Sequence, residues 1–549
     1  MPHTSGTCAL TLAILASGSL LGCTGATRMT DSTTGKAIAG PYANAHDLAR
    51  GADYARRDAD WRFGPIVYQV LVDRFAPSER LDEKLDLYAP PRRLREWSER
   101  PTSGHYLEDA RVWSHEVDFW GGDLDSVRTR LEHIDDLGAD VLYLNPIPDA
   151  LTNHKYDAID YRTIAPEFGD REDLRELTDS VHAMGMKLML DGVFNHTGRN
   201  SPFFESASAG EDSPYRDWYI FDANQPHGYR AWYDVANLPE LNLENPEVRA
   251  YLWEDDDSVM KSFLADGADG WRLDVAYDIG FEYLRQLTAH AHAFKPGSAI
   301  IGEIWSYPED WGHSVDGLMN FHLRSIVLSL ARGDISGHHA SAMITTMVDD
   351  AGVEPILRSW LMLDNHDTQR LATMLPDTER RRLAQVLQFT LPGAPVIYYG
   401  SELGMTGGDD PEMRGPMRWD LIEDEDPDAI AELEWVRSLV DMRRSNRALR
   451  IGDYRHLPTE RAMAFLRRTD RYAETVIVLC NAEDEPVREV VAVRDSKQMG
   501  SNPFVDQIGG GEVHAFSGII EVEIPARTAM VLTPKPVDGG RYSSHKRMQ

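Results

Sequence analysis

The sequence predicts an α/β protein built on a (β/α)₈ barrel of the TIM type, with an insertion after the third strand and a C-terminal antiparallel β-sandwich domain. Three observations predict this fold. Short apolar runs of strand length recur along residues 61–450. Helix-like segments such as 124–137 and 171–184 separate most of these runs. Polar residues collect where the runs end, at the face on which such barrels carry their functional groups.

The length and charge of the chain limit its class. With 549 residues, the chain is too long for one hydrophobic core and suggests a large domain with smaller ones attached. The formal net charge of −33 excludes nucleic acid as a partner, because a polyanion would be repelled. A neutral substrate would not be repelled, and the 13 Trp and 21 Tyr residues suit a cleft with aromatic walls.

The first residues have the pattern of an export signal. Residues 10–21 form an apolar run too short for a stable membrane anchor, and Leu-Leu-Gly-Cys follows at 20–23. This pattern resembles a bacterial lipoprotein signal over 1–23, in which Cys23 would carry the lipid. We therefore expect export, as a periplasmic or membrane-anchored lipoprotein or otherwise as a secreted protein. The membrane would be contacted only through the lipid. No Lys or Arg precedes the apolar run, which leaves a misassigned start open as an alternative.

Eight apolar runs are predicted to form the barrel. Each is apolar along its whole length, which is typical of parallel strands that are buried on both faces. The runs are 66–72, 139–144, 187–193, 268–275, 299–304, 315–320, 359–363 and 395–399.

The segments on either side of the barrel have a different character. Residues 24–60 lack sustained periodicity and are predicted to be a flexible tether. Residues 451–536 contain further strand-like runs without helical segments, which predicts the C-terminal β-domain. Residues 537–549 are predicted to be a disordered tail.

Carboxylates stand at the ends of two neighbouring predicted strands. Arg272 and Asp274 point to the same face of strand four, so the guanidinium is expected to keep Asp274 ionised. Glu303 ends strand five, where the apolar neighbours Ile304 and Trp305 are expected to keep it protonated. Breaking an acetal bond with retention needs such a pair, one group to attack the anomeric carbon and one to protonate the leaving oxygen.

Five segments, each at the end of a predicted strand, resemble signature regions of the α-amylase family of glycoside hydrolases. Their order along the chain makes the match specific, although each alone is also compatible with a cap or a turn. The resemblance covers the chain from about residue 66 to about residue 534. The matching segments are 191–196 (DGVFNH), 270–274 (GWRLD), 302–305 (GEIW), 365–367 (NHD) and 398–404 (YYGSELG).

The resemblance implies a role for each strand-end residue. Asp274 would be the nucleophile and Glu303 the general acid/base. Asp367 would be a third carboxylate that holds sugar hydroxyls in the transition state. His196 and His366 would bind hydroxyls in the same subsite.

The resemblance also implies two loops around the cleft. The loop after strand two would present Tyr156 as a stacking platform for a sugar ring, with Asp157 beside it. The long segment 197–262 after strand three would be the family's domain B, which walls the cleft.

Two sequence motifs resemble those of the neopullulanase and cyclomaltodextrinase branch of the family: HKYD at 154–157 and GWRLDV at 270–275. That branch usually carries an N-terminal β-domain that helps to form a dimer. There is no room for it before residue 66, so we expect a monomer. The implied activity is retaining hydrolysis of α-1,4-glucosidic bonds, with some tolerance of α-1,6 bonds, in maltooligosaccharides, starch-type glucans or cyclomaltodextrins. A transglycosylase or isomerase of the same family, such as a trehalose synthase, and a non-catalytic sugar-binding protein are the alternatives.

The implied chemistry requires no cofactor, and a structural calcium ion is left open. Asn195 occupies a position that ligates calcium in many members of the family. A strand-end Asn also caps turns, however, and no spacing of oxygen ligands in the sequence singles out a calcium cage.

Overall fold

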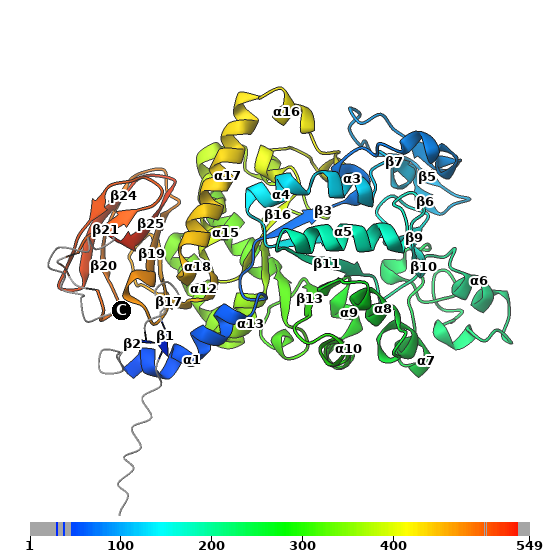
Figure 1. Ribbon diagram of the computed structural model, residues 1–549, viewed down its shortest axis with the longest axis horizontal. Coiled ribbons are helices and arrows are strands. Elements are labelled where there is room, and N and C mark those ends of the chain that lie inside the picture. Colours follow the sequence, from blue (N-terminus) through cyan, green and yellow to red (C-terminus); the bar gives the residue numbers. More distant parts are fainter. Residues whose placement is uncertain (1–28, 31–36, 39–44, 499, 501, 536–549) are drawn as a thin grey trace, which may run out of the picture.

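The computed structural model describes residues 29–30, 37–38, 45–498, 500 and 502–535. Its centre is a closed barrel of eight parallel strands, which confirms the predicted fold (Figure 1). The order around the barrel follows the order along the chain, so each strand pairs with its sequence neighbours. The strands are β3 (Val67–Val70), β8 (Val141–Leu144), β11 (Lys187–Gly192), β12 (Gly270–Leu273), β13 (Ala299–Ile304), β14 (Gly317–Asn320), β15 (Trp360–Met362) and β16 (Ala394–Tyr398).

The continuous apolar runs form strands that are buried on both faces. Apart from Lys187 at the start of β11, every residue of the eight strands is buried. Side chains such as Val67, Tyr143 and Met319 belong to one apolar cluster, and the alternate residues join the larger core under the helices. Gly270 opens β12 where a Cβ would lie 2.2 Å from the carbonyl oxygen of Ala299, so only glycine fits there.

Helices cover the outside of the barrel. α5 (Arg171–Ala183) begins where the side chain of Asp170 accepts hydrogen bonds from the first backbone N–H groups. The helix predicted over 124–137 is two helices, because Arg130 leaves helical geometry between them. The other helices are α2 (Val72–Phe75), α3 (Leu124–Thr129), α4 (Leu131–Leu137), α8 (Val259–Ala265), α9 (Ala276–Ile279), α10 (Phe281–Phe294), α11 (Phe321–Arg332), α12 (Gly337–Ala351), α13 (Val353–Arg358), α14 (Leu371–Met374), α15 (Thr378–Thr390), α16 (Trp419–Glu423), α17 (Pro427–Ser445) and α18 (Arg447–Ile451).

Two long insertions follow the carboxyl ends of β3 and β11. The second contains α6 (Pro202–Ala209) and α7 (Pro246–Arg249) and packs around aromatic rings such as Phe204 and Tyr229, whose centroids are 4.7 Å apart. The first spans 76–123 and was not predicted. Its strands pair only among themselves, and the hairpin β9–β10 lies after β8. The strands are β4 (Arg93–Leu94), β5 (Tyr106–Leu107), β6 (Val112–Trp113), β7 (Asp118–Phe119), β9 (Pro148–Ala150) and β10 (Ala158–Ile164).

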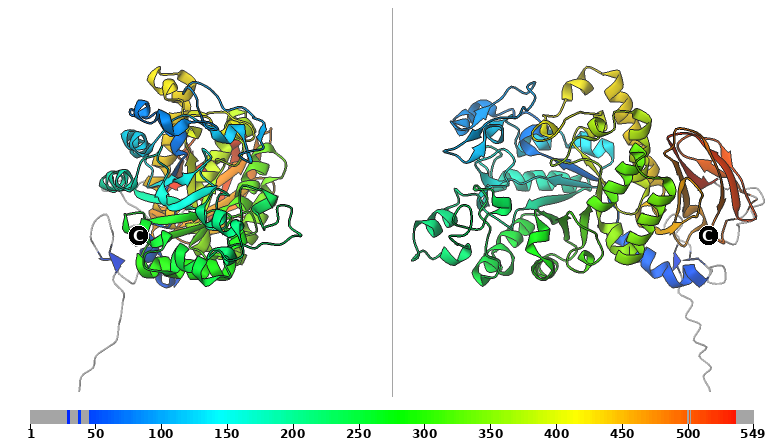
Figure 2. Two further views of the ribbon diagram at one scale, coloured as in Figure 1. Left: turned by 90° about the vertical axis from the view of Figure 1, so that its right-hand side faces the viewer. Right: turned by 180° about the vertical axis from the view of Figure 1, so that it is seen from behind.

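The C-terminal strands form two antiparallel sheets, as predicted. Figure 2 shows this domain at one end of the barrel and the two insertions at the other. One sheet has the order β17-β18-β19-β25-β21-β22 and the other β20-β24-β23, with apolar side chains packed between them. The strands are β17 (Asp453–His456), β18 (Met463–Arg468), β19 (Thr475–Asn481), β20 (Val487–Ala492), β21 (Phe504–Asp506), β22 (Glu512–Val513), β23 (Ala515–Phe516), β24 (Ile519–Ile524) and β25 (Thr528–Pro534).

A helix, α1 (Ala45–Ala59), lies where the flexible tether was predicted, so that prediction is wrong for this part of 24–60. The buried Arg57 of α1 donates hydrogen bonds to Glu354 of α13 and Asp453 of β17, both at 2.9 Å. The helix thereby joins the barrel to the C-terminal domain. Its four buried residues are Asp47, Gly51, Tyr54 and Arg57, without an aliphatic side chain among them, which is why apolar periodicity did not predict the helix.

The predicted signal with Cys23 and the predicted tail 537–549 lie outside the described residues. In the part of the chain that the structure describes, no helix has the length and apolar character needed to cross a membrane.

Candidate active site

Arg272 organises the acidic groups at the carboxyl ends of β11, β12 and β13. Its side chain is fully buried, and its Nη1 lies 2.9 Å from both carboxylate oxygens of Asp191 and 3.0 Å from Asp274 Oδ1. Its Nη2 lies 2.9 Å from Glu303 Oε2. One guanidinium therefore holds three carboxylates together, including the two predicted to perform the chemistry.

Asp274 follows directly after β12, and its charge is only partly compensated. Burial raises the pKa of Asp274 well above its ordinary value; Arg272 opposes this rise, whereas the charges of Glu303 and Asp191 add to it. Arg272 thus favours the ionised form of Asp274, as predicted, but the stronger opposite effect of burial was not predicted. Because three carboxylates share one cation, the cluster as a whole retains a proton more readily than separate carboxylates would.

Glu303, at the end of β13, has polar neighbours, which corrects the prediction of an apolar environment. The indole N–H of Trp305 donates to Glu303 Oε1 at 2.9 Å, and the backbone N–H of Val275 donates to Oε2 at 3.1 Å. Val275 adopts a left-handed conformation with φ of +48°, which is rare for a β-branched residue. This strained residue links the position after Asp274 to the carboxylate of Glu303.

Trp305 is fixed by a stacking contact and still has an open face. Its ring centroid is 3.5 Å from that of Phe321, with 17° between the planes. The side chain is nevertheless 57% exposed. A fixed, exposed indole next to Glu303 suits a sugar ring on the leaving-group side of the reaction.

The third predicted carboxylate, Asp367, lies in the loop after β15. His366 Nε2 lies 3.0 Å from Asp367 Oδ2, and Arg414 Nη2 lies 3.5 Å from Oδ1. The amide nitrogen of Gln69 lies 2.8 Å from His366 Nδ1 and donates to it, which assigns the ring proton to Nε2. Burial lowers the pKa of His366 well below its ordinary value, so the ring is neutral.

Tyr156 lies in the loop after β8 and lines the same cavity as Asp274, Glu303 and Asp367. Its hydroxyl donates to Asp191 at 2.9 Å and accepts from Asn145 at 2.9 Å. Its ring lies parallel to that of His366, with centroids 5.4 Å apart. These contacts fix the orientation of the predicted platform.

Asp157, predicted to lie beside the platform, does not line the cavity. It accepts hydrogen bonds from the Thr152 hydroxyl and from the Asn237 amide, the latter at 3.1 Å. Asp157 therefore fastens this loop to the insertion after β11. The hydrogen bonds of the Asp157 carboxylate are made within the protein.

His196 closes the cavity from the β11 side. Its ring stacks on Trp232 at a centroid distance of 5.8 Å, and its Nε2 is buried without a partner among the described residues. Burial lowers the pKa of His196 to about 4. A neutral imidazole with an open nitrogen suits a sugar hydroxyl, as predicted for this residue.

Asn195 makes its contacts within the protein. Its side-chain nitrogen lies 3.3 Å from His196 Nδ1, and its carbonyl oxygen accepts from the backbone of Leu241 at 2.9 Å. Within the described residues, no group of three or more His, Cys, Asp or Glu side chains is arranged to hold a metal ion. The calcium ion therefore stays a prediction without support from these residues.

Several residues that line the cavity were not predicted to do so: some come from loops without a motif, and others, such as His154 and Trp305, from within the matched segments. Arg414 and Asp410, in the loop after β16, form an ion pair of 3.1 Å. His154 faces Glu116 of the first insertion at 3.4 Å. The cavity has a volume of about 710 Å³. Its other missed side chains are Trp232, Tyr233, Val235, Leu238, Val275, Tyr277, Asp278 and Trp305.

This cavity brings together the carboxyl groups of Asp274, Glu303 and Asp367, the neutral imidazole of His196 and exposed aromatic rings at the carboxyl face of a (β/α)₈ barrel, whereas His366 lies behind Asp367 and does not line it. That combination defines a glycoside hydrolase, in which carboxylates act on the acetal bond and aromatic rings hold the sugar. Comparison with known proteins agrees. Residues 69–436 match the family model described as alpha amylase, catalytic domain, and the chain belongs to the α-amylase family.

Similar proteins include several α-glucan hydrolases. The chain is 32% identical to neopullulanase 2 of Thermoactinomyces vulgaris, over 86% of this chain and 78% of that protein. It is 34% identical to a cyclomaltodextrinase of Geobacillus thermopakistaniensis, over 81% of this chain and 72% of that protein. The solved structure of a cyclic alpha-maltosyl-(1→6)-maltose hydrolase from Arthrobacter globiformis matches with a TM-score of 0.72 and 28% identity, covering 86% of this chain and 99% of that one.

Proposed function

We propose that the protein is a retaining hydrolase of α-1,4-glucosidic bonds, with some tolerance of α-1,6 bonds, in maltooligosaccharides, starch-type glucans or cyclomaltodextrins. The observation that carries the proposal is the contact of Asp274 and Glu303 with the same guanidinium, 3.0 Å and 2.9 Å away. Retention requires two carboxyl groups about 5–5.5 Å apart. Two carboxylates that contact one guanidinium lie close enough together for such a separation.

In the first step, a carboxylate oxygen of Asp274 attacks the anomeric carbon while the bond to the leaving oxygen breaks. Glu303 gives its proton to that oxygen, and a glycosyl ester on Asp274 remains. In the second step, Glu303 takes a proton from water as the water oxygen attacks the same carbon. The ester bond breaks, Asp274 is free again, and Glu303 is protonated as at the start.

The remaining side chains bind the sugar that reacts. Asp367 and the neutral imidazole of His196 line the cavity and suit the hydroxyls of the ring that passes through the oxocarbenium-like transition state. Tyr156 would stack under that ring, because its hydroxyl is held by Asp191 and Asn145 and its orientation is fixed. These groups are placed before the substrate arrives, which favours the transition state.

The relatives support the proposed bond specificity. A neopullulanase, a cyclomaltodextrinase and a hydrolase of a cyclic sugar with a 1→6 link are all similar to this chain over most of its length. Proteins of this kind support a cleft that accepts bent or cyclic α-glucans. Transglycosylation is the second candidate reaction. The exposed rings of Trp305 and Tyr277 favour it, because they suit a sugar acceptor that would compete with water.

A product profile tests the proposal. The protein, beginning before α1, is incubated with maltoheptaose, pullulan, cyclomaltodextrin and maltose, and the products are followed by chromatography and by NMR of the anomeric protons. Short products that appear first as α-anomers are expected. First products of β configuration would contradict retention. Products longer than the substrate, or trehalose from maltose, would assign the protein to the transferases or isomerases, and no turnover would favour a sugar-binding protein.

We propose further that the protein is exported and lipidated at Cys23, on the basis of the pattern at 10–23. Radiolabelled palmitate is expected to label the full chain and not the variant Cys23→Ala. Equal labelling of both would contradict the proposal.

We also propose a structural calcium ion, and this proposal rests on the resemblance at Asn195 alone. Addition of a calcium chelator would lower the melting temperature if an ion were bound. An unchanged melting temperature would rule out a stabilising ion.

A further inference from the structure

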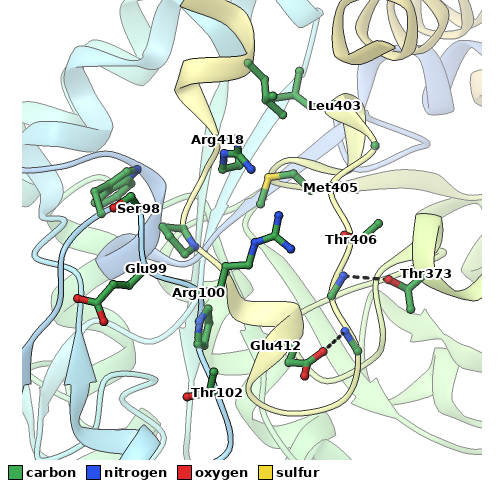
Figure 3. Close-up of a pocket in the computed structure, with 18 residues that line it drawn as sticks. Ser98, Glu99, Arg100, Thr102, Thr373, Leu403, Met405, Thr406, Glu412 and Arg418 are labelled. Carbon is green, nitrogen blue, oxygen red and sulfur yellow. Dashed lines mark hydrogen bonds between the residues drawn. The ribbon is translucent and has the colours of Figure 1, made fainter. Parts of the chain in front are cut away.

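A second cavity lies beside the catalytic cleft, across the loop that follows β16. It has a volume of about 510 Å³, and it shares no lining residue with the cleft. Figure 3 shows its walls, which are formed by residues 97–102 of the first insertion, by residues 403–408 and by parts of 412–421. The cavity is thus a separate site, although one loop divides it from the cleft.

The loop 409–415 presents different side chains to the two cavities. Asp410 and Arg414 face the catalytic cleft, whereas Glu412 lines the second cavity. The loop is short and hydrogen-bonded within itself: the backbone N–H of Glu412 donates to Asp409 at 2.8 Å, and that of Arg414 donates to Pro411 at 3.0 Å. The second cavity therefore has a preformed wall.

Two of the four charged residues around this cavity are already engaged with neighbours. Arg418 donates two hydrogen bonds to Asp420, at 2.8 and 2.6 Å. Glu99 accepts from Arg95 at 3.3 Å. The charges of Arg418 and Glu99 are therefore largely compensated by neighbouring residues.

The other two charged side chains remain open to a ligand. Arg100 forms no hydrogen bond or ion pair with another residue that the structure describes, and it extends from the 97–102 segment toward the 403–408 loop (Figure 3). Glu412 Oε2 accepts from the backbone N–H of Gly408 at 3.2 Å and has no cationic partner among the described side chains. The cavity thus offers one free donor group and one free acceptor group of opposite charge.

The side chains of Arg100 and Glu412 are both exposed. The hydroxyls of a neutral polyol can use both groups, since a hydroxyl can accept from the guanidinium and donate to the carboxylate. The remaining lining residues suit the same ligand. Hydroxyl groups come from Ser98, Thr102, Thr373 and Thr406, and apolar surfaces come from Trp97, Pro101, Met405 and Pro416.

We propose that this cavity is a second saccharide-binding site, which binds a short neutral sugar or the end of a glucan chain separately from the catalytic cleft. That the sugar is an α-glucan rests on the proposed function. That it is a neutral saccharide rests on the cavity alone.

The test uses the full chain with Glu303→Gln, which is expected to slow turnover strongly, and maltotriose as the probe. Isothermal titration calorimetry counts the sites, and a crystal soaked with maltotriose locates them. Two sites are expected. Adding Arg100→Gln or Glu412→Gln weakens the second site at least about tenfold, because each removes a charge-assisted hydrogen bond. The control is Arg80→Gln, an exposed arginine of the first insertion that pairs with Glu83 and does not line the cavity.

One site only, lost with Asp367→Asn and unchanged by Arg100→Gln and Glu412→Gln, would overturn the inference. Displacement of maltotriose from the second cavity by inorganic phosphate would overturn it too, because the site would then prefer an anion. Melting temperatures show that the variants are folded. If the unmodified protein hydrolysed no glucan while maltotriose still occupied the second cavity, the proposed function would fail and this inference would stand.

Discussion

At the residue scale, the electrostatics of the cleft depend on one buried arginine. Arg272 contacts Asp191, Asp274 and Glu303 within 3.0 Å, and burial raises the pKa of Asp191 to about 6. Three acids around one cation can keep a proton in the cleft near neutral pH. A general acid requires such a proton in its resting state.

Replacing the proposed general acid should show this requirement directly. Glu303→Gln is expected to lower kcat for maltotriose about 10²–10⁴-fold, because the amide cannot protonate the leaving oxygen. Initial rates measure the effect. Trp305→Phe is the matched control, since it removes the neighbouring N–H donor but keeps the carboxyl group, and its kcat should fall far less. Near-full activity of Glu303→Gln would contradict the assigned role.

The buried imidazole of His196 predicts a pH dependence of stability. Its pKa is lowered to about 4 in the folded protein, so between about pH 6.5 and 4 the unfolded chain binds the proton and the folded chain does not. The free energy of unfolding therefore falls as the pH drops through this window, by up to about 3 kcal/mol from this group.

Urea unfolding at several pH values measures that slope. His196→Gln should flatten it, and the difference between wild type and variant isolates this group from the carboxylates of the cleft. An unchanged slope would show that His196 is protonated in the folded protein or does not titrate in this window.

At the scale of elements, loops rather than strands decide what surrounds the carboxylates. The barrel strands place Arg272 and Glu303, but Glu116 comes from the first insertion and Arg414 from the loop after β16. The first insertion also forms one wall of the second cavity. This insertion therefore shapes both sites, although none of its residues had a motif.

The helix α1 offers a sharp test of an element that was first interpreted as a tether. Arg57 is fully buried between Glu354 and Asp453. Arg57→Met is expected to lower the free energy of unfolding by about 1.5–3 kcal/mol, because it removes charge-assisted hydrogen bonds to Glu354 and Asp453 from a buried side chain. Arg56→Met is the control: Arg56 contacts the same Glu354 at 3.0 Å, but its side chain is 52% exposed, and its loss should cost about 0–1 kcal/mol. Equal effects on urea unfolding would mean that α1 is not docked.

At the scale of the whole molecule, the insertions and the C-terminal domain occupy opposite ends of the barrel (Figure 2). Among the described residues of the C-terminal domain, none lines the cleft or the second cavity. Its inner side shares one apolar core with the helices of the barrel. We infer that it stabilises the barrel and leaves the chemistry to the opposite end.

The predicted monomer belongs to this scale. Analytical ultracentrifugation of the protein is expected to give a mass near that of one chain, with activity proportional to protein concentration. A dimer mass that persists on dilution, with loss of activity when it dissociates, would contradict the proposal.

Local pattern sufficed for the eight strands and for the strand-end residues Asp274, Glu303 and Asp367. A buried strand is apolar along its whole length, and a barrel brings the carboxyl ends of its strands to one face. The family assignment followed from the same residues, because their order and spacing are local properties of the chain.

Only the tertiary structure decided which partners these residues have. Asp157 turned out to bind Asn237, 80 positions along the chain, and Arg57 binds Asp453, 396 positions along. The second cavity joins residues 97–102 to residues 403–421. Contacts of this kind arise when the barrel closes and the loops fold over its face, and no spacing within one segment records them. Burial raises the pKa of a carboxyl group only once the chain has folded around it. The pKa of Asp274 is therefore raised, although Arg272 lies beside it and was predicted to keep it ionised.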